Sequence, residues 1–216
     1  MHNSEFIKML NNIVDEETLQ DNLSFTAFYI AVYENLACTT EERIKVFYQN
    51  GIVCHEDGTC EYTYATDYNV RIKKRVVDAE GNKNPLKASM LWLVDEGAIT
   101  QDDYKLFLKI KEQRNVFAHE LTSVIFRGNM EEEIILFFQM LELYQKIDTW
   151  WINEIEIPTS GEFMPGEYDS QGVESVVVGL YKVMIDVLYR GQSEKLKSYI
   201  TEYMKKHGGD SDEDQI

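Results

Sequence analysis

Apolar residues recur along most of this chain every three or four positions, the spacing that places them on one face of an α-helix. Only three prolines occur among 216 residues, so few positions lack the backbone N–H that a helix needs. We therefore expect an all-α protein built as an up-and-down helical bundle. No linker divides the sequence, and we predict one domain over residues 1–208 followed by a disordered acidic tail, 209–216.

Capping residues mark where several of these helices begin. Asn84 can cap a helix whose first residue is Pro85, and Thr100 precedes Asp103 by three positions, close to a capping box. Thr40 is the expected cap of a short helix that follows the first long one. The expected helices span residues 16–36, 40–48, 85–96, 101–128, 131–154, 173–189 and 194–206, with a loop at 158–169.

Residues 52–82 interrupt the helical pattern as an irregular insertion. Residues 61–66 alternate aromatic and polar side chains, and the stretch from Asp78 to Asn82 is typical of a turn. A short hairpin and an inserted loop both fit this segment.

Two of the three cysteines, Cys54 and Cys60, flank a turn-like stretch that includes His55. A zinc site needs three or four ligands at suitable spacing, and only these three candidates lie close together in the sequence. We therefore favour reduced thiols near a loop over a metal site, and we expect neither a metal nor an organic cofactor.

The formal net charge is -17, from 38 acidic against 21 basic residues. Proteins that bind by neutralising phosphates usually have the opposite balance, so any nucleic-acid site must be local. Arg71, Lys73, Lys74 and Arg75 form one local basic cluster, which is more typical of a solvated surface than of a binding patch.

Neither a membrane anchor nor a secretion signal is evident in the sequence. No apolar run reaches the roughly 18 residues that a membrane-spanning helix needs. The first ten residues, MHNSEFIKML, lack the charged and then apolar layout of a signal peptide. We expect a cytoplasmic protein without a membrane partner.

The most informative segment is Arg114-Asn115-Val116-Phe117-Ala118-His119, which lies on an expected helix with apolar flanks. Asn115 and His119 are four residues apart and share a helix face. Arg114 points about 100° away from Asn115, but its side chain is long enough to reach the same pocket. Three polar groups among such neighbours are costly unless they meet partners or solvent.

These residue types suit cleavage of a ribose–phosphate backbone. The histidine side chain titrates near physiological pH, so it can accept and return a proton. Arginine offers a permanently charged, forked donor to a phosphate whose negative charge grows as a 2′-hydroxyl attacks it. Asparagine can orient either group, and the chemistry needs no metal. The structural alternative is a buried hydrogen-bond network that fixes the packing of two helices.

The segment resembles the R-N-x-x-x-H signature of the HEPN superfamily, small helical proteins of toxin–antitoxin, CRISPR-associated and phage-defence systems. Tyr29, Tyr33 and Glu34 are similar to the family's aromatic-then-acid pattern, although Glu34 taken alone is more typical of a surface acid. The resemblance covers roughly residues 17–50 and 84–155, and the insertion at 52–82 matches no part of it.

The resemblance implies a helical bundle of HEPN type that forms a homodimer, in which two copies of the motif make one composite cleft. It implies that Arg114 and His119 are the catalytic pair, with Asn115 as a supporting residue, in an endoribonuclease that leaves a 2′,3′-cyclic phosphate on its RNA substrate. A toxin or phage-defence effector, restrained by an antitoxin or another regulatory protein, is the role it suggests.

Two other functions fit the sequence. Some members of the superfamily have lost cleavage and act as protein-binding or regulatory modules, which the acidity of this chain favours. A mimic of nucleic acid would instead gather its acidic residues on one face and occupy basic grooves of other proteins.

Overall fold

The computed structural model of the protein describes residues 15–55, 57–122, 130–161 and 169–190. The chain divides into two compact units, the first ending at Val173 and the second beginning at Glu174. Most described residues are helical, and a two-stranded sheet is the only sheet among them. The helical class is therefore confirmed. The helix expected at 194–206 and the tail at 209–216 lie outside the described residues, and the extent of a single domain over 1–208 stays a prediction.

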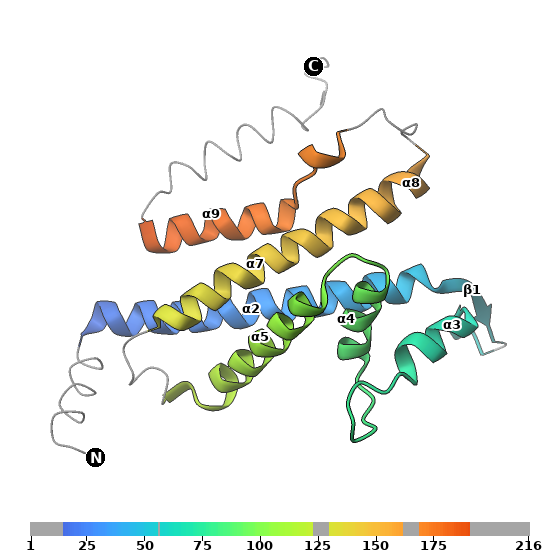
Figure 1. Cartoon of the computed structure of the whole chain (residues 1–216), viewed down its shortest axis with the longest axis horizontal. Helices are drawn as coiled ribbons and strands as arrows, with labels where there is room; N and C mark the ends of the chain where they lie inside the picture. The colour runs from blue at the N-terminus through green and yellow to red at the C-terminus, as the bar shows by residue number, and fades with distance from the viewer. Residues whose placement is uncertain (1–14, 56, 123–129, 162–168, 191–216) are drawn as a thin grey trace. The chain divides into compact units, whose positions relative to one another are not determined.

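Helix α2 (Glu16–Phe47) runs through the first unit, and three helices pack against it, as Figure 1 shows: α4 (Pro85–Asp95), α5 (Gln101–His119) and α7 (Glu131–Trp151). Aromatic side chains form the centre of this packing. Phe25 and Tyr29 of α2 both contact Phe117 of α5 and Phe137 of α7. The aromatic residues that recur at helical spacing in the sequence thus join three helices.

Helix α2 continues through the position where we expected a break. Thr40 is a buried residue inside the helix and not its cap, so the prediction of separate helices at 16–36 and 40–48 is wrong. No glycine or proline lies between them, and contacts with α7 hold the segment. The Tyr144 hydroxyl donates to Asn35 Oδ1 at 2.5 Å and lies 3.2 Å from Thr39 Oγ1. These contacts outweigh the preference of threonine for helix ends.

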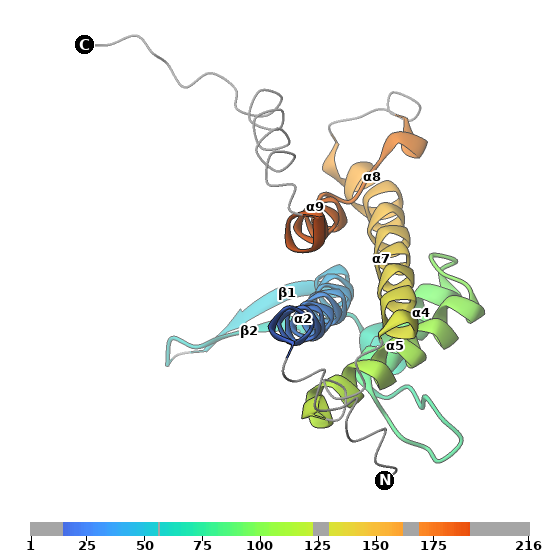
Figure 2. The ribbon, with the colours of Figure 1, turned by 90° about the vertical axis from the view of Figure 1, so that its left-hand side faces the viewer.

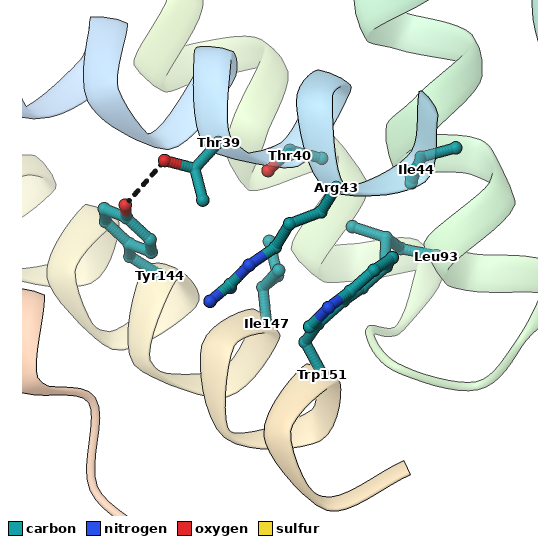
Figure 3. Close-up of a pocket in the computed structure, with 8 residues that line it drawn as sticks. All are labelled: Thr39, Thr40, Arg43, Ile44, Leu93, Tyr144, Ile147 and Trp151. Carbon is teal, nitrogen blue, oxygen red and sulfur yellow. Dashed lines mark hydrogen bonds between the residues drawn. The ribbon is translucent and has the colours of Figure 1, made fainter. Parts of the chain in front are cut away.

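The same part of α2 forms a crevice with α4 and α7, drawn in Figure 3. The side chain of Arg43 lies along it, paired with the buried carboxylate of Asp148 and 5.9 Å from the ring centroid of Trp151. Its apolar walls are Ile44, Leu93, Ile147 and Trp151. Because the crevice has no room for a water molecule, it is a packing seam between helices and not a ligand site.

Both helix starts predicted from caps near the motif are confirmed. Asn84 Oδ1 accepts a hydrogen bond from the backbone N–H of Lys87 at 2.9 Å, and Pro85 is the first residue of α4. Thr100 and Asp103 form a reciprocal capping box at the start of α5. The sequence therefore fixes where the helix that carries the motif begins.

Two predicted helix ends are wrong. Helix α5 stops at His119, because the backbone of Glu120 leaves the helical region, so the motif occupies its last turns and not its middle. Leu121 and Thr122 are again helical, and 123–129 lie outside the described residues. Helix α7 continues as the π-helix η2 (Ile152–Glu156) and as α8 (Ile157–Ser160), so Pro158 stands at a helix start and the first residues of the loop predicted at 158–169 are helical. Residues 162–168 lie outside the described part of the chain.

The irregular insertion contains a hairpin, one of the two structures that the sequence allowed. Strand β1 (Gln49–Cys54) pairs antiparallel with β2 (Cys60–Tyr64) and projects away from α4, α5 and α7 (Figure 2). Two short helical segments follow, α3 (Thr66–Tyr68) and η1 (Asn69–Lys73), which we did not predict. The turn at 78–82 is confirmed by the hydrogen bond from the Asn82 N–H to Asp78 Oδ1 at 2.9 Å.

The prediction of reduced thiols in the insertion is wrong, because Cys54 and Cys60 form a disulfide. They are paired residues of the two strands, with Cα atoms 4.0 Å apart. The hairpin brings together two cysteines whose spacing in the sequence gave no sign of pairing. With both sulfur atoms bonded to each other, the zinc site weighed for this segment has lost two of its three candidate ligands.

Reducing this disulfide should loosen the hairpin and leave the helices intact. An isolated two-stranded hairpin is marginally stable in water, and closing a loop this short contributes about 2 kcal/mol in the chain-entropy model. We expect amide hydrogen exchange in β1 and β2 to speed up by about tenfold or more with dithiothreitol, and exchange in α2 and α5 to stay the same. Unchanged exchange in the strands would mean that other contacts hold the hairpin.

The basic cluster at 71–75 attaches η1 to the end of α4. Arg71 pairs with Glu96 at 2.6 Å and Arg75 with Asp95 at 2.6 Å, while Lys73 lies over two tyrosine rings. The two arginines are partly exposed and pair with carboxylates of the protein itself, while Lys73 and Lys74 are exposed.

The second unit contains α9 (Val176–Arg190), which matches the helix predicted over 173–189. No helix within the described ranges is both long and apolar enough to cross a membrane.

Candidate functional site

The three candidate catalytic residues, Arg114, Asn115 and His119, lie in the last two turns of α5. Phe117, between them in the sequence, is 1% exposed and lies edge-on to Phe25 and Tyr29 of α2. Because Phe117 fixes which face of the helix is buried, the side chains of Asn115 and His119 are left on the exposed surface.

Glu34 of α2 holds the guanidinium of Arg114. The Arg114 Nε donates to Glu34 Oε1 at 2.6 Å, and Nη2 donates to the same oxygen. The guanidinium carbon lies 5.5 Å from the ring centroid of Tyr33, one residue earlier on α2. The aromatic-then-acid pattern of the first helix and the motif, eighty residues apart, are therefore neighbours in space. Glu34 is exposed, as expected of a surface acid, and it also pairs with the candidate residue Arg114.

Arg114 also reaches Asn115, and these contacts leave two of its donors unused within the described part of the chain. Its Nη1 donates to Asn115 Oδ1 at 3.0 Å. A guanidinium has five N–H donors, of which Glu34 and Asn115 take three. The other two, one on each Nη atom, have no acceptor among the described residues. Since the side chain is 30% exposed, an anion in solvent can reach them.

His119 is the last residue of α5, and its side chain is exposed. It forms no hydrogen bond or ion pair with any residue in the described part of the chain. Helical spacing places it on the same face as Asn115, one turn further along. The structure thus joins Arg114 and Asn115 to Glu34 and leaves His119 one turn away.

If the motif had only a structural role, its polar side chains would form a buried hydrogen-bond network between two helices. Glu34, Arg114 and Asn115 do connect α2 with α5, but none of the three side chains is buried. The arrangement leaves polar groups accessible, which a purely structural network does not require.

Tyr33 provides a ring face and not a proton-transfer group. Burial raises the pKa of the Tyr33 hydroxyl to about 12, and the nearby Arg114 opposes this shift. The phenol is therefore neutral at physiological pH, and its ring supports the guanidinium by a cation–π contact.

In the parts of the chain that the structure describes, no three His, Cys, Asp or Glu side chains are grouped so that they could hold a metal ion.

Comparisons of the chain with models of protein families, with curated proteins and with solved structures find no match.

Proposed function

We propose that this protein is a metal-independent endoribonuclease of HEPN type that acts as a homodimer. The observation that carries the proposal is the accessibility of the motif: Arg114 is oriented by Glu34 yet keeps two N–H donors for an anion. Asn115 and His119 lie exposed on the same helix beside it. These are the groups that the resemblance assigns to catalysis.

In this mechanism Arg114 binds the scissile phosphate through its free N–H groups. An imidazole of His119 accepts the proton of the ribose 2′-hydroxyl as the 2′-oxygen attacks phosphorus. The bond between phosphorus and the 5′-oxygen breaks, and the leaving oxygen takes a proton from a second, protonated imidazole. The products are a 2′,3′-cyclic phosphate and a 5′-hydroxyl. Arg114 stabilises the charge that grows on the phosphate oxygens as the 2′-oxygen attacks.

A dimer supplies the second imidazole that a single copy of the protein lacks. One motif carries one imidazole, whereas the reaction accepts a proton on one side of the phosphate and delivers a proton on the other. Two copies facing each other would place one His119 on each side. This agrees with His119 lying one turn from Arg114, with no contact between the two side chains.

Cleavage of RNA in the presence of EDTA tests the proposal. Purified protein is incubated with single-stranded RNA and with tRNA under chelation, and fragments are separated by size. Cleavage that persists in EDTA supports the proposal, and the absence of cleavage of every RNA tried contradicts it.

Replacing Glu34 with alanine should lower the rate of this cleavage by about tenfold, because the guanidinium of Arg114 loses the carboxylate that orients it. Glu34→Gln keeps an oxygen acceptor and should lose less activity. Both effects are measured as kcat and KM on the same RNA. An increase in rate for Glu34→Ala would mean that Glu34 blocks the phosphate site instead of preparing it.

The second candidate is a catalytically inactive HEPN-like module that binds or regulates another protein. The observation in its favour is that a carboxylate already occupies Arg114 in a chain of net charge -17. Under this alternative a protein partner co-purifies with the chain, and Arg114→Ala and His119→Ala both keep the partner. In a toxin or phage-defence effector, such a partner would instead restrain cleavage, and its removal would release nuclease activity.

A further inference from the structure

Helix α9, the orange-red helix of Figure 1, carries a row of exposed apolar side chains along one face. Val176, Leu180, Met184 and Leu188 stand four residues apart and are between 45% and 60% exposed, and Val177 beside them is 37% exposed. Residues four apart lie one above the other on a helix. These five side chains therefore form one continuous stripe about 18 Å long, which we name the α9 stripe.

No member of the α9 stripe is charged, and the charged residues Lys182 and Asp186 lie away from it. Lys182 is about 160° around the helix from both Leu180 and Met184, and Asp186 is on the same side as Lys182. A helix as rich in apolar residues as α9 is ordinarily covered, and a contiguous exposed apolar patch marks an interaction site. We therefore expect something to pack against the stripe.

The spacing of the α9 stripe is symmetric about its middle. Val176 and Leu188 lie six residues on either side of Lys182, and Leu180 and Met184 lie two residues on either side of it. If two copies of α9 pair antiparallel about a twofold axis at this point, Val176 of each copy meets Leu188 of the other. Leu180 then meets Met184 in the same way. Such a contact uses one surface twice, and it places the positive end of each helix dipole beside the negative end of the other.

Charge and area both suit a second copy of the chain as the occupant. The net charge is -17, so two copies repel each other, and they approach at the lowest cost where no acidic side chain becomes buried. The α9 stripe meets this condition. Two stripes in contact bury on the order of 1,000 Å² in total, the low end for a specific interface. We therefore expect a reversible dimer with a dissociation constant on the order of 10 µM.

We propose that the α9 stripe is the surface through which two copies of this chain associate, with their α9 helices antiparallel. The inference adds to the homodimer of the proposed function the surface that joins its two copies, and the pairing itself does not depend on cleavage. The residues of the stripe are contact residues and take no part in proton transfer.

Sedimentation velocity of the full chain over a wide range of protein concentrations measures the pairing. The variants are Leu180→Glu and Met184→Glu, and each should weaken the dimer by at least about tenfold, because a carboxylate would be buried against apolar side chains. Lys182→Glu is the matched control, since it lies on the other side of α9 and adds more negative charge than either variant. Its dissociation constant should stay within about twofold of the wild-type value.

Cysteine cross-linking tests the antiparallel order and does not depend on the glutamate variants. Val176→Cys and Leu188→Cys are made in a chain with Cys38→Ser, because Cys38 is an exposed free thiol and the other two cysteines are bonded to each other. Mild oxidation of a mixture of the two variants should give a disulfide-linked dimer. Each variant alone should give much less, because its two cysteines are about 18 Å apart along the paired helices.

The outcomes separate the α9 pairing from the nuclease. A wild-type dimer that is equally stable in Leu180→Glu and Met184→Glu, without cross-links in the mixture, would overturn the pairing and leave the nuclease proposal untouched. Weakened dimers and cross-links in the mixture, with no RNA cleavage by the wild type, would support the pairing and contradict the nuclease.

Three further results would overturn the α9 pairing. A wild type that is monomeric at every concentration would do so, and a lower Tm for Leu180→Glu in that case would mean that the stripe is covered within one chain. An equal loss of the dimer in Lys182→Glu would show general repulsion between copies. Cross-links that form with each cysteine variant alone, and not in preference in the mixture, would contradict the antiparallel order.

Discussion

Replacing His119 with alanine should reduce the rate of RNA cleavage by about 10²- to 10⁴-fold, the range for loss of a general acid or base. His119 is exposed at the end of α5, so its removal leaves no cavity and should not lower the stability of the fold. The rate is measured in EDTA by following fragments of a labelled single-stranded RNA. Far-ultraviolet circular dichroism and thermal unfolding should be the same for the variant and the wild type.

A matched control for this variant is His55→Ala. His55 is also exposed, but it lies in the hairpin, in the segment that matches no part of the HEPN pattern. We expect its cleavage rate to equal that of the wild type. Equal activity in His119→Ala and His55→Ala would remove His119 from the mechanism, and loss of activity in both would indicate that any nuclease present depends on something other than the motif.

The second large effect is on stability. Phe117 lies inside the motif but is buried, with its ring centroid 4.9 Å from that of Tyr29 and 6.2 Å from that of Phe25. Phe117→Ala should lower the free energy of unfolding by about 3–5 kcal/mol, because it removes a large apolar side chain and leaves a cavity. Urea unfolding followed by tryptophan fluorescence measures the loss.

Phe138→Ala is the control with the same chemical change. Phe138 of α7 is 45% exposed, so its replacement should cost only a fraction of that amount, about 1 kcal/mol or less. A similar loss in the two variants would mean that Phe117 does not anchor α5 on α2. The two predictions together assign different roles within six residues: His119 acts in the reaction, and Phe117 holds the helix that presents it.

The features of the fold that could be predicted from the sequence are those set by local chemistry. The side chains of Asn84 and Thr100 accept hydrogen bonds from backbone N–H groups three residues later, at the start of a helix. Both predicted helix starts are confirmed. The break expected at Thr40 failed because Thr40 is buried and the neighbouring Thr39 contacts Tyr144 of α7, which local preference does not reveal.

The parts of the site that sequence reasoning missed depend on contacts between distant residues. Arg114, Asn115 and His119 were found because they stand close together on one helix. Glu34 reaches Arg114 from eighty residues away, and its only signal was its place after Tyr33 in the first helix. Cys54 and Cys60 were misread in the same way, because only the register of the hairpin places them opposite each other.

We propose that the exposed imidazole and guanidinium at the end of α5 cut RNA by attack of its own 2′-oxygen. The most direct measurement is the chemistry of the ends produced from unmodified single-stranded RNA in EDTA, determined by mass spectrometry of the fragments. We predict a 2′,3′-cyclic phosphate on one fragment and a 5′-hydroxyl on the other, with neither formed by Arg114→Ala or His119→Ala. Fragments that end in a 3′-hydroxyl and a 5′-phosphate, or intact RNA after prolonged incubation with the wild type, would contradict the account.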